Sequence, residues 1–411
     1  MADRVVLSSY YPFLAALVAL LIGLTVGKAW ERYKLRAGRL IDRRRVPESL
    51  HYIVGLNFLV TNQIDLAIDE LSKAAENLGD ALEIHLLLGS LYREKGQVAR
   101  AINIHQSLLQ RPRLTRLEQA HILLCLGLDF KRGGFVDRAL EAFNEVIKLD
   151  PTNQYALLNI EKLHEDQHQW QEAYDVRRSL GSQAGAEDGR SQAILAFLEN
   201  ELGLQAVARG DYAGAIVRFQ SAIDLDSGVV PAYLNLGDIH ARDDQMAQAA
   251  SIWQEAIDKA PERAYLTFDR LSLAYSRMGT PDRFPQLLGK LIGNNPQDWR
   301  ARLALARDLE ARNDLAGSLE LLFEALVHNP HALTLHQAIW QVLARLDFES
   351  TLVQRYVDLT RHAVFYMDPH ICMRCRYRST ELLWQCPHCH EWNTFVEDRI
   401  APAKEPEELG V

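Results

Sequence analysis

The chain has 411 residues, of which 48% are apolar and 24% are charged, and its net charge is -9 at pH 7. This composition is ordinary for a folded protein and argues against a largely disordered chain. The length is too great for one ordinary core and indicates two or three folded units, or a repeat array. The negative net charge gives no overall reason to expect binding to nucleic acid or anionic lipid.

Residues 1–30 predict a membrane anchor. No charged residue occurs between Val5 and Gly27, and aromatic side chains lie at both ends of this stretch. A bilayer core requires roughly 20 apolar residues, so the stretch is just long enough to cross it as a helix. Aromatic rings favour the membrane interface, which agrees with their positions here.

Basic residues crowd directly after the apolar stretch. They are Lys28, Arg32, Lys34, Arg36, Arg39, Arg43, Arg44 and Arg45. The positive-inside rule therefore predicts a single-pass protein with its amino terminus outside and the bulk of the chain in the cytoplasm. A cleaved signal peptide would instead carry its positive charge before the apolar core. Residues 31–47 are then a basic juxtamembrane linker, which either attracts anionic headgroups or only sets the topology.

Residues 48–362 predict an all-α repeat array. Small residues recur with a period of 34, which separates Gly55 from Gly89 and Gly203 from Gly237. Two closely crossing antiparallel helices need small side chains where their backbones approach. With prolines near the ends of units, the period resembles the tetratricopeptide repeat and predicts a solenoid. The expected units, about eight, begin near residues 48, 82, 120, 154, 196, 230, 265 and 299, and a helical remnant at 333–362 closes the array.

Surplus residues interrupt this period at 181–191, where the sequence is GSQAGAEDGRS. Glycine and serine there predict a joint between the first four and the last four units, and the alternative is a plain surface loop. Arrays of this kind bind peptides or protein surfaces. The scattered histidines, such as His105 and His240, form no metal-ligand set, and we expect most of them at the surface or in the groove of the array. The isolated Cys125 is expected to be a buried apolar residue.

Four of the five cysteines occur together in the segment CMRCRYRSTELLWQCPHC. Cys372 and Cys375 form one Cys-x-x-Cys pair, and Cys386 and Cys389 form another. Two such pairs can place four thiolates tetrahedrally around one ion, which a single redox pair would not explain. The clustering also indicates a reducing compartment rather than a disulfide framework. The sequence therefore predicts a metal domain at residues 368–398.

Sulfur ligands alone leave the choice between iron and zinc open. We expect four aromatic side chains to form the small apolar core of the metal domain: Tyr377, Trp384, Trp392 and Phe395. The element WQCPHC, with a tryptophan shortly after it, resembles a rubredoxin knuckle. Many knuckles carry glycine after the second cysteine, where the backbone is left-handed, and Arg376 and His390 occupy those positions here. His370, His388 and His390 are not expected to be ligands, because four cysteines fill the shell.

The order of anchor, basic linker, repeats and knuckle resembles the lipopolysaccharide assembly protein B family of Gram-negative bacteria. The resemblance implies a non-enzymatic inner-membrane adaptor that faces the cytoplasm. In that family the protein helps a membrane-bound AAA+ metalloprotease to degrade the deacetylase that commits carbon to lipid A, and so limits lipopolysaccharide synthesis. The implied partners are this protease and lipopolysaccharide-synthesis enzymes. The implied metal ligands are Cys372, Cys375, Cys386 and Cys389, and a homo-oligomer is left open.

Two other classes of function stay open from the residues. An iron-loaded knuckle would be an electron carrier, with the repeats docking a reductase. Arg374, Arg376 and Arg378 would suit a nucleic-acid reader, but the acidic flexible tail at 399–411 and the lack of a larger basic surface argue against nucleic acid. The sequence contains no catalytic-triad, phosphate-loop, HExxH or paired-carboxylate motif, so we expect no catalysis. We expect the knuckle to pack on the last repeats and to help recognise a partner.

Overall fold

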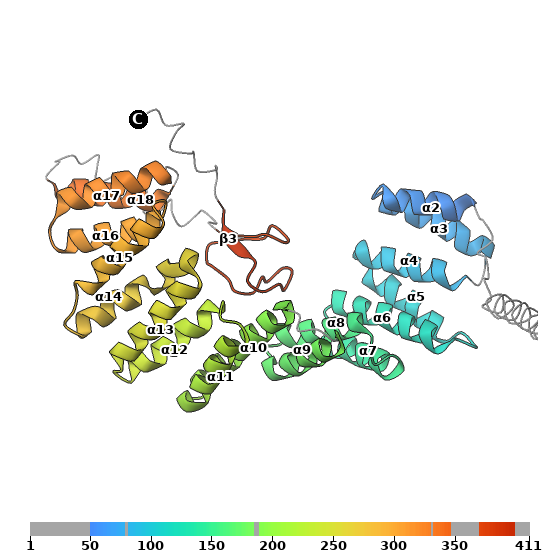
Figure 1. The fold of residues 1–411 in the computed structure, drawn as a ribbon. Coiled ribbons are helices and arrows are strands. Elements are labelled where there is room, and N and C mark those ends of the chain that lie inside the picture. Colours follow the sequence, from blue (N-terminus) through green and yellow to red (C-terminus); the bar gives the residue numbers. More distant parts are fainter. Residues whose placement is uncertain (1–49, 79–80, 185–188, 330–331, 347–369, 399–411) are drawn as a thin grey trace, which may run out of the picture. The chain divides into compact units, whose positions relative to one another are not determined.

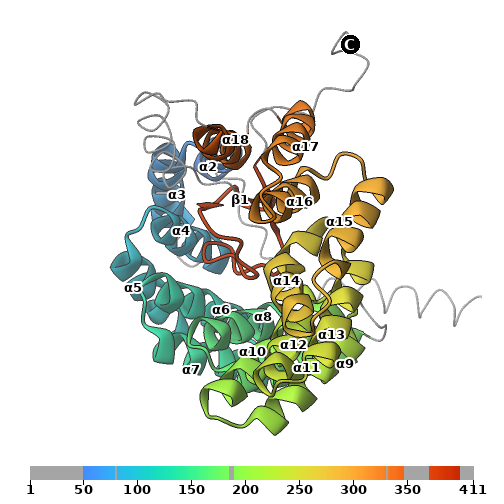
Figure 2. The same cartoon turned by 90° about the vertical axis from the view of Figure 1, so that its left-hand side faces the viewer.

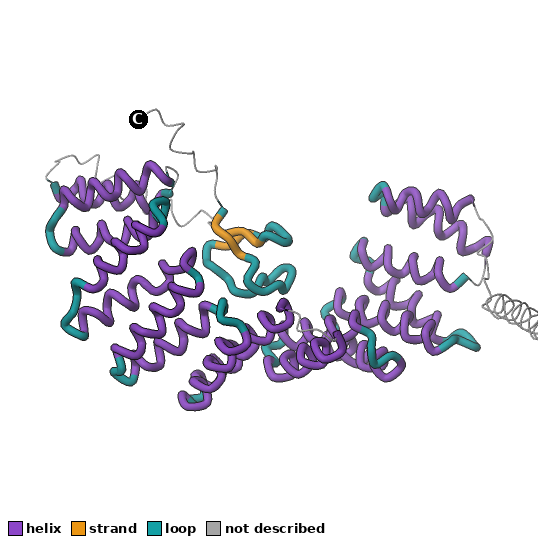
Figure 3. The backbone as a smooth tube through the Cα atoms, in the orientation of Figure 1, coloured by secondary structure: helices purple, strands orange, loops and turns teal. Residues whose placement is uncertain are grey.

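The computed structural model describes residues 50–78, 81–184, 189–329, 332–346 and 370–398. The chain divides into two compact units, residues 1–151 and residues 152–411. Most of the described chain is helical, as the repeat period predicts, and a small sheet lies near the carboxyl terminus (Figure 1 and Figure 3). The fold is therefore an all-helical tetratricopeptide array followed by a small cysteine-rich domain.

The described part of the first unit consists of consecutive helix pairs. They are α2 (Leu50–Val60) with α3 (Ile64–Leu78), α4 (Leu82–Glu94) with α5 (Val98–Leu109), and α6 (Arg116–Arg132) with α7 (Val136–Leu149). Gly96 and Gly134 lie in the turns within the second and third pairs, with φ of 77° and 75°. Glycine takes this left-handed backbone without steric penalty, which allows each turn to be short.

The second unit continues the same arrangement. Its helices are α8 (Gln154–Asp166), α9 (Trp170–Ala184), α10 (Gly189–Ala208), α11 (Tyr212–Leu225), α12 (Val230–Arg242), α13 (Met246–Lys259), the 3-10 helix η1 (Pro261–Thr267), α14 (Phe268–Arg277), α15 (Arg283–Asn294), α16 (Trp299–Ala311), α17 (Leu315–His328) and α18 (Leu333–Arg345). The division between the units lies at residue 151. The joint expected at 181–191 falls inside the second unit, and its mechanical role stays a prediction.

A glycine in the first helix of a pair faces a larger side chain in the second helix. The spacing of 16 positions recurs in Gly55–Leu71, Gly89–His105, Gly127–Phe143, Gly203–Phe219 and Gly237–Trp253. A Cβ atom added at Gly127 or Gly203 would lie 2.5 Å from the facing phenylalanine ring, closer than van der Waals contact allows. These glycines allow the two helices to approach, and their recurrence explains the period in the sequence.

His105 takes the place that aromatic rings occupy in other pairs, but it is polar and fully buried. Its Nδ1 atom is hydrogen-bonded to the Asp129 carboxylate, and Arg93 donates to the same carboxylate at 2.9 Å. A buried carboxylate needs such partners, because an unpaired charge in the interior costs several kcal/mol. His105 is thus an exception to the expected surface histidines, whereas Cys125 is buried as expected.

A three-stranded antiparallel sheet forms part of the cysteine-rich domain, which we call the knuckle (residues 370–398). Its strands are β1 (His370–Cys372), β2 (Arg378–Ser379) and β3 (Phe395–Glu397), in the order β2-β1-β3. Ile371 in the middle strand is opposite Arg378 on one side and Val396 on the other. These three side chains therefore share one face of the sheet.

No helix within the described ranges is long and apolar enough to cross a membrane. The predicted anchor at 1–30, the basic linker at 31–47 and the acidic tail at 399–411 lie outside the described residues. Of the helical remnant expected at 333–362, the described part contains α18.

We expect Gly203→Ala to destabilise the second unit, because the added methyl group would overlap the Phe219 ring. Overpacking of this kind costs about 1–3 kcal/mol of unfolding free energy. Gly289→Ala in α15 is the matched control, since nothing lies within 4 Å of its Cβ position. Alanine in place of that helical glycine should stabilise by about 0.5–1 kcal/mol. Chemical denaturation followed by circular dichroism measures both, and equal effects would contradict the packing role of Gly203.

Candidate metal centre

The two Cys-x-x-Cys segments fold into loops with the same backbone hydrogen bonds. In the first loop the Cys372 N–H donates to the Tyr377 carbonyl at 2.8 Å. In the second loop the Cys386 N–H donates to the Glu391 carbonyl at 2.9 Å. Each loop is thus closed five residues after its first cysteine, so that both sulfurs of a pair lie on the same side.

Arg376 and His390 close the two turns with left-handed backbone, at φ of 64° and 56°. Their N–H groups donate back to the carbonyls of Cys372 and Cys386, at 2.9 and 2.8 Å. These are the positions where many knuckles carry glycine, and a side chain there costs roughly 1–2 kcal/mol. The knuckle geometry is therefore kept although neither residue is glycine.

The four cysteine sulfurs gather around one point. Their Sγ atoms all lie within 4.8 Å of one another, with 3.7 Å between Cys372 and Cys389 and 3.6 Å between Cys375 and Cys386. Four sulfurs placed tetrahedrally at about 2.3 Å from an ion are about 3.8 Å apart. The donor set and its spacing fit one metal ion. Within the described ranges no histidine or carboxylate joins this group.

Hydrogen bonds around the sulfurs favour a thiolate at Cys372. Burial raises the pKa of this thiol, but the Thr394 hydroxyl at 3.2 Å and loop N–H groups, among them that of Cys375, outweigh burial and lower the pKa to about 6. Burial raises the pKa of the Cys386 and Cys389 thiols instead. A bound cation is therefore needed to hold all four side chains as thiolates.

The interior of the knuckle is small. Cys372, Cys386 and Phe395 are buried, with Leu382 and Leu383 packed against them. The tryptophans expected in this core are not part of it, because they point out of the knuckle toward the repeats. A domain of this size has too little apolar surface to fold without a cross-link, and a metal can replace the missing core.

The two tryptophans dock the knuckle onto the helices of the second unit. The ribbon of the knuckle lies beside these helices in Figure 1 and Figure 2. The Trp392 ring stacks on Phe197 of α10 with centroids 5.3 Å apart and meets Trp170 of α9 edge-on at 6.2 Å. The Trp384 ring contacts Phe197 at 6.2 Å and lies 5.0 Å from the guanidinium of Arg263 in η1. Each aromatic pair contributes about 0.5–1.5 kcal/mol beyond the burial of its area.

Glu165 of α8 is the polar centre of this contact. Its carboxylate accepts a hydrogen bond from the Gln385 amide at 2.7 Å and another from the Trp392 indole N–H at 3.2 Å. Burial and the neighbouring Glu161 raise the pKa of Glu165 to about 7. The carboxyl group between α8 and the knuckle therefore changes its charge near neutral pH.

Charged groups surround the aromatic contact. They join Lys162 to the His390 carbonyl, Arg190 to Glu391, Arg300 to Glu397 and His390 to Asp166, at 3.1, 2.8, 3.0 and 2.6 Å. Partly exposed ion pairs contribute only about 0–1 kcal/mol each. They therefore fix the orientation of the knuckle, while the rings supply most of the stabilisation.

The knuckle packs on α8, α9, α10, η1 and α16. The sequence predicted packing on the last repeats, and the contacts in fact extend much further toward the middle of the array. The reason lies in the aromatic surface that Trp170 and Phe197 provide far from the end of the array. The sequence analysis did not identify Trp170, Phe197 or Glu165 as docking residues. In the sequence they are indistinguishable from residues that pack one helix of a repeat against the next. One feature of the sequence could have indicated the docking: the metal domain contains two tryptophans and is too small to bury both of them.

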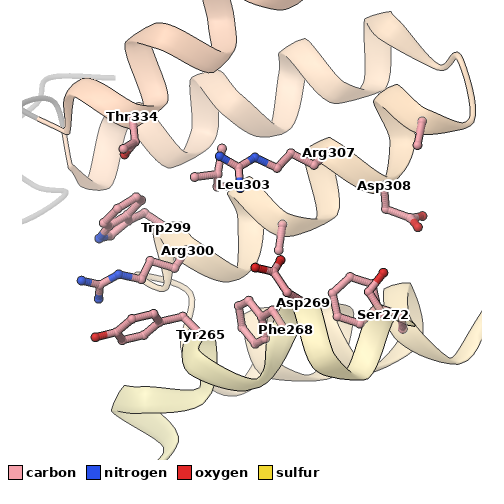
Figure 4. Close-up of a pocket in the computed structure, with 13 residues that line it drawn as sticks. Tyr265, Phe268, Asp269, Ser272, Trp299, Arg300, Leu303, Arg307, Asp308 and Thr334 are labelled. Atoms are coloured by element: carbon pink, nitrogen blue, oxygen red, sulfur yellow. The ribbon is translucent and has the colours of Figure 1, made fainter. Parts of the chain in front are cut away.

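A cavity of 420 Å³ lies in the second unit, lined by residues of η1, α14 and α16 (Figure 4). Arg300 on its wall lies 4.1 Å from the centroid of the Tyr265 ring and 4.8 Å from that of Trp299, and it also pairs with Glu397 of the knuckle. The lining contains no histidine or cysteine.

Comparisons with known proteins agree with this architecture. Residues 370–397 match a family model described as a rubredoxin metal binding domain, and residues 206–268 match one described as a tetratricopeptide repeat. Lipopolysaccharide assembly protein B of Escherichia coli (strain K12) is 27% identical over 84% of this chain and 89% of that protein. The protein of the same name from Haemophilus influenzae is 24% identical over 92% of this chain and 97% of that protein.

The resemblance to the lipopolysaccharide assembly protein B family that the sequence predicts is confirmed by these relatives. The metal-domain match lies on the four clustered cysteines, and both relatives align over most of their length, so the similarity covers repeats and knuckle together. Among solved structures, the C-terminal part of a tetratricopeptide-repeat protein from Cytophaga hutchinsonii aligns with 70% of this chain and 99% of that chain, at 12% identity and a TM-score of 0.40.

Cys386→Ser should abolish metal binding, because the serine oxygen is a poor substitute for one of four sulfurs. We expect about one ion per chain in the wild type and almost none in the variant, with the helices retained. Elemental analysis measures the metal, and hydrogen exchange should increase in the knuckle and at Trp170 and Phe197. Cys125→Ala, which changes the cysteine outside the cluster, is the control and should keep its ion. A metal-free but fully docked Cys386→Ser protein would contradict the site.

Glu165→Gln should change the pH dependence of stability. Because the folded-state pKa of about 7 exceeds the value of about 4.3 for an unfolded glutamate, wild-type stability falls as the pH rises between these values. Like the protonated acid, glutamine has one carbonyl oxygen that accepts a hydrogen bond in this contact, and it does not ionise. The unfolding free energy of Glu165→Gln, relative to that of the wild type, should therefore increase with pH by on the order of 1–3 kcal/mol up to about pH 8.

Thermal unfolding of the metal-loaded protein, from about pH 5 to pH 8, measures this difference. The exposed Glu172→Gln in α9 is the matched control and should follow the wild-type profile. Parallel profiles for wild type and Glu165→Gln would contradict a carboxyl group that ionises within the contact.

Proposed function

We propose that this chain is a non-enzymatic adaptor that limits lipopolysaccharide synthesis. It brings the deacetylase that commits carbon to lipid A to a membrane AAA+ protease for degradation, and it also organises lipopolysaccharide-assembly enzymes as a scaffold. The support is the similarity of this chain, over most of its length, to proteins that are named for lipopolysaccharide assembly. The repeat array adds to this, because arrays of this type bind protein surfaces.

The adaptor acts at the inner membrane in this proposal. Residues 1–30 anchor it, and the basic residues after them favour a cytoplasmic location for the bulk of the chain. A tether of this kind raises the effective concentration of the repeats near membrane-bound partners. Adaptor function therefore needs only modest affinity for each partner.

The observation that carries the proposal is the docking of the knuckle on the repeats through Trp384 and Trp392. Cys372, Cys375, Cys386 and Cys389 would hold one iron or zinc ion, which supplies a cross-link between the two loops when bound. The loops orient the tryptophans, and the rings attach the knuckle to Phe197. Knuckle and repeats then offer one continuous surface to a partner. An electron carrier with iron is the alternative, but the names of the relatives give it no support.

Loss of the gene should lengthen the half-life of the deacetylase and raise its level, because the protease would lack its adaptor. A pulse-chase measurement of the deacetylase, with and without the wild-type gene, tests this. Trp392→Ala should fail to restore degradation, since it removes the ring that stacks on Phe197. Tyr155→Ala, a substitution of an exposed side chain in α8, is the control and should restore it. An unchanged half-life after gene loss would refute the proposal.

A further inference from the structure

The knuckle uses one side for docking and leaves another side open. The residues of the knuckle that contact the repeats are Trp384, Gln385, His390, Glu391, Trp392 and Glu397. The carboxylates of Glu391 and Glu397 pair with arginines there. In the first loop, residues 373–378, every residue except Cys375 is exposed. The side chains of this loop are therefore accessible to another molecule.

Large apolar side chains are open to water on and beside this loop. Met373 is 56% exposed, Tyr377 is 41% exposed and Val396 of β3 is 43% exposed. The Met373 N–H donates to the Thr394 carbonyl at 2.9 Å, which joins the loop to the segment that leads into β3. So much exposed apolar surface on so small a domain indicates a binding surface. We call Met373, Arg374, Arg376, Tyr377, Arg378 and Val396 the first-loop surface.

Three arginines alternate with these apolar side chains. Arg374 pairs with Glu391, and Arg378 pairs with Asp398 at 2.9 Å. Arg376 is exposed, and no carboxylate of the described residues pairs with it. Its position in the turn is fixed by the hydrogen bond to the Cys372 carbonyl. This bond is made by the backbone N–H and fixes the backbone of Arg376, and its exposed guanidinium can offer its planar fork to a carboxylate from outside.

The charge of the first-loop surface favours a protein partner over lipid or nucleic acid. Arg374 and Arg378 are each paired with a carboxylate, so Arg376 is the arginine of this surface that has no carboxylate partner among the described residues. An anionic membrane attracts a basic residue by only about 1 kcal/mol, and phosphate chains need several cations. One open arginine beside methionine and tyrosine is instead the composition found at the centres of protein interfaces.

We propose that the first-loop surface binds a segment of a partner protein that carries aspartate or glutamate beside an apolar side chain. The carboxylate is held by Arg376, and the apolar side chain packs between Met373 and Tyr377. This deepens the scaffold function proposed above and rests on it for the biological role of the partner. The surface exists only while the knuckle is folded, so binding depends on the same four cysteines.

The test selects short random peptides, displayed on phage, against the metal-loaded full-length protein in mild detergent. Peptides selected by the wild type should carry an acidic residue next to an apolar one. A synthetic copy of one such peptide should bind Arg376→Glu at least about tenfold more weakly, because the reversal puts like charges together. Met373→Ala should also weaken binding. Arg277→Glu, the same change at an exposed arginine of α14, is the matched control and should bind as the wild type does.

The metal content of each variant is measured first, so that a lost knuckle is not mistaken for a lost contact. Selected peptides without acidic residues, or equal affinity for wild type and Arg376→Glu, would overturn the proposal. The proposal would also be overturned if no peptide is selected and a short-chain phosphatidylglycerol or an oligonucleotide binds in a way that depends on Arg376.

The half-life of the deacetylase in cells separates this inference from the function it rests on. If gene loss leaves the half-life of the deacetylase unchanged while the binding of acidic peptides still depends on Arg376, the proposed function is wrong and the first-loop surface is still a binding site. If the half-life depends on the gene but Arg376→Glu binds the peptides normally, the surface is wrong and the proposed function stands.

Discussion

The attachment of the knuckle to the repeats depends on one constraint, the meeting of four cysteine sulfurs within 4.8 Å of one another. The interior beside them contains little more than Phe395 and two leucines, too little to hold two loops in place. Because the sulfurs fix the loops, the knuckle does not need its tryptophans for its own core. Trp384 and Trp392 are thereby available to the repeats.

Both the docking contact and the helix pairs depend on close packing around an aromatic ring, but the ring has a different role in each. Within a pair, a glycine leaves room for a ring such as Phe143 or Phe219, and the helices close over it. At the knuckle, the ring of Phe197 is itself the receiving surface, and tryptophans come to it from another domain. Close packing around aromatic rings therefore sets both the repeat geometry and the place of the metal domain.

The sequence was informative where the chemistry is local or periodic. The 34-residue period predicted the helical array, because Gly55 and Gly89 must each face a larger side chain from the neighbouring helix. The two Cys-x-x-Cys pairs predicted which sulfurs would meet, since each loop is built from a few consecutive residues. The positions after the second cysteines, Arg376 and His390, are left-handed as the knuckle pattern requires.

What the sequence could not supply is the pairing of segments far apart in the chain. Trp170, Phe197 and Glu165 lie in helices whose pattern differs little from that of their neighbours. Their role follows from contact with a domain about 200 residues later, to which no periodicity refers. For the same reason Trp384 and Trp392 were assigned to the wrong core, because a small domain with aromatic residues ordinarily buries them itself.

The hydrogen bond between Gln385 and Glu165 joins residues 220 positions apart, and this separation has a consequence for synthesis of the protein. At a translation rate of about 5–20 residues per second, α8 leaves the ribosome roughly 10 to 45 s before Gln385 is made. During that interval the rings of Trp170 and Phe197 lack their cover and are open to chaperones or to other nascent chains. Completion of this face is therefore among the last events of folding, and it waits for both the end of translation and the supply of metal.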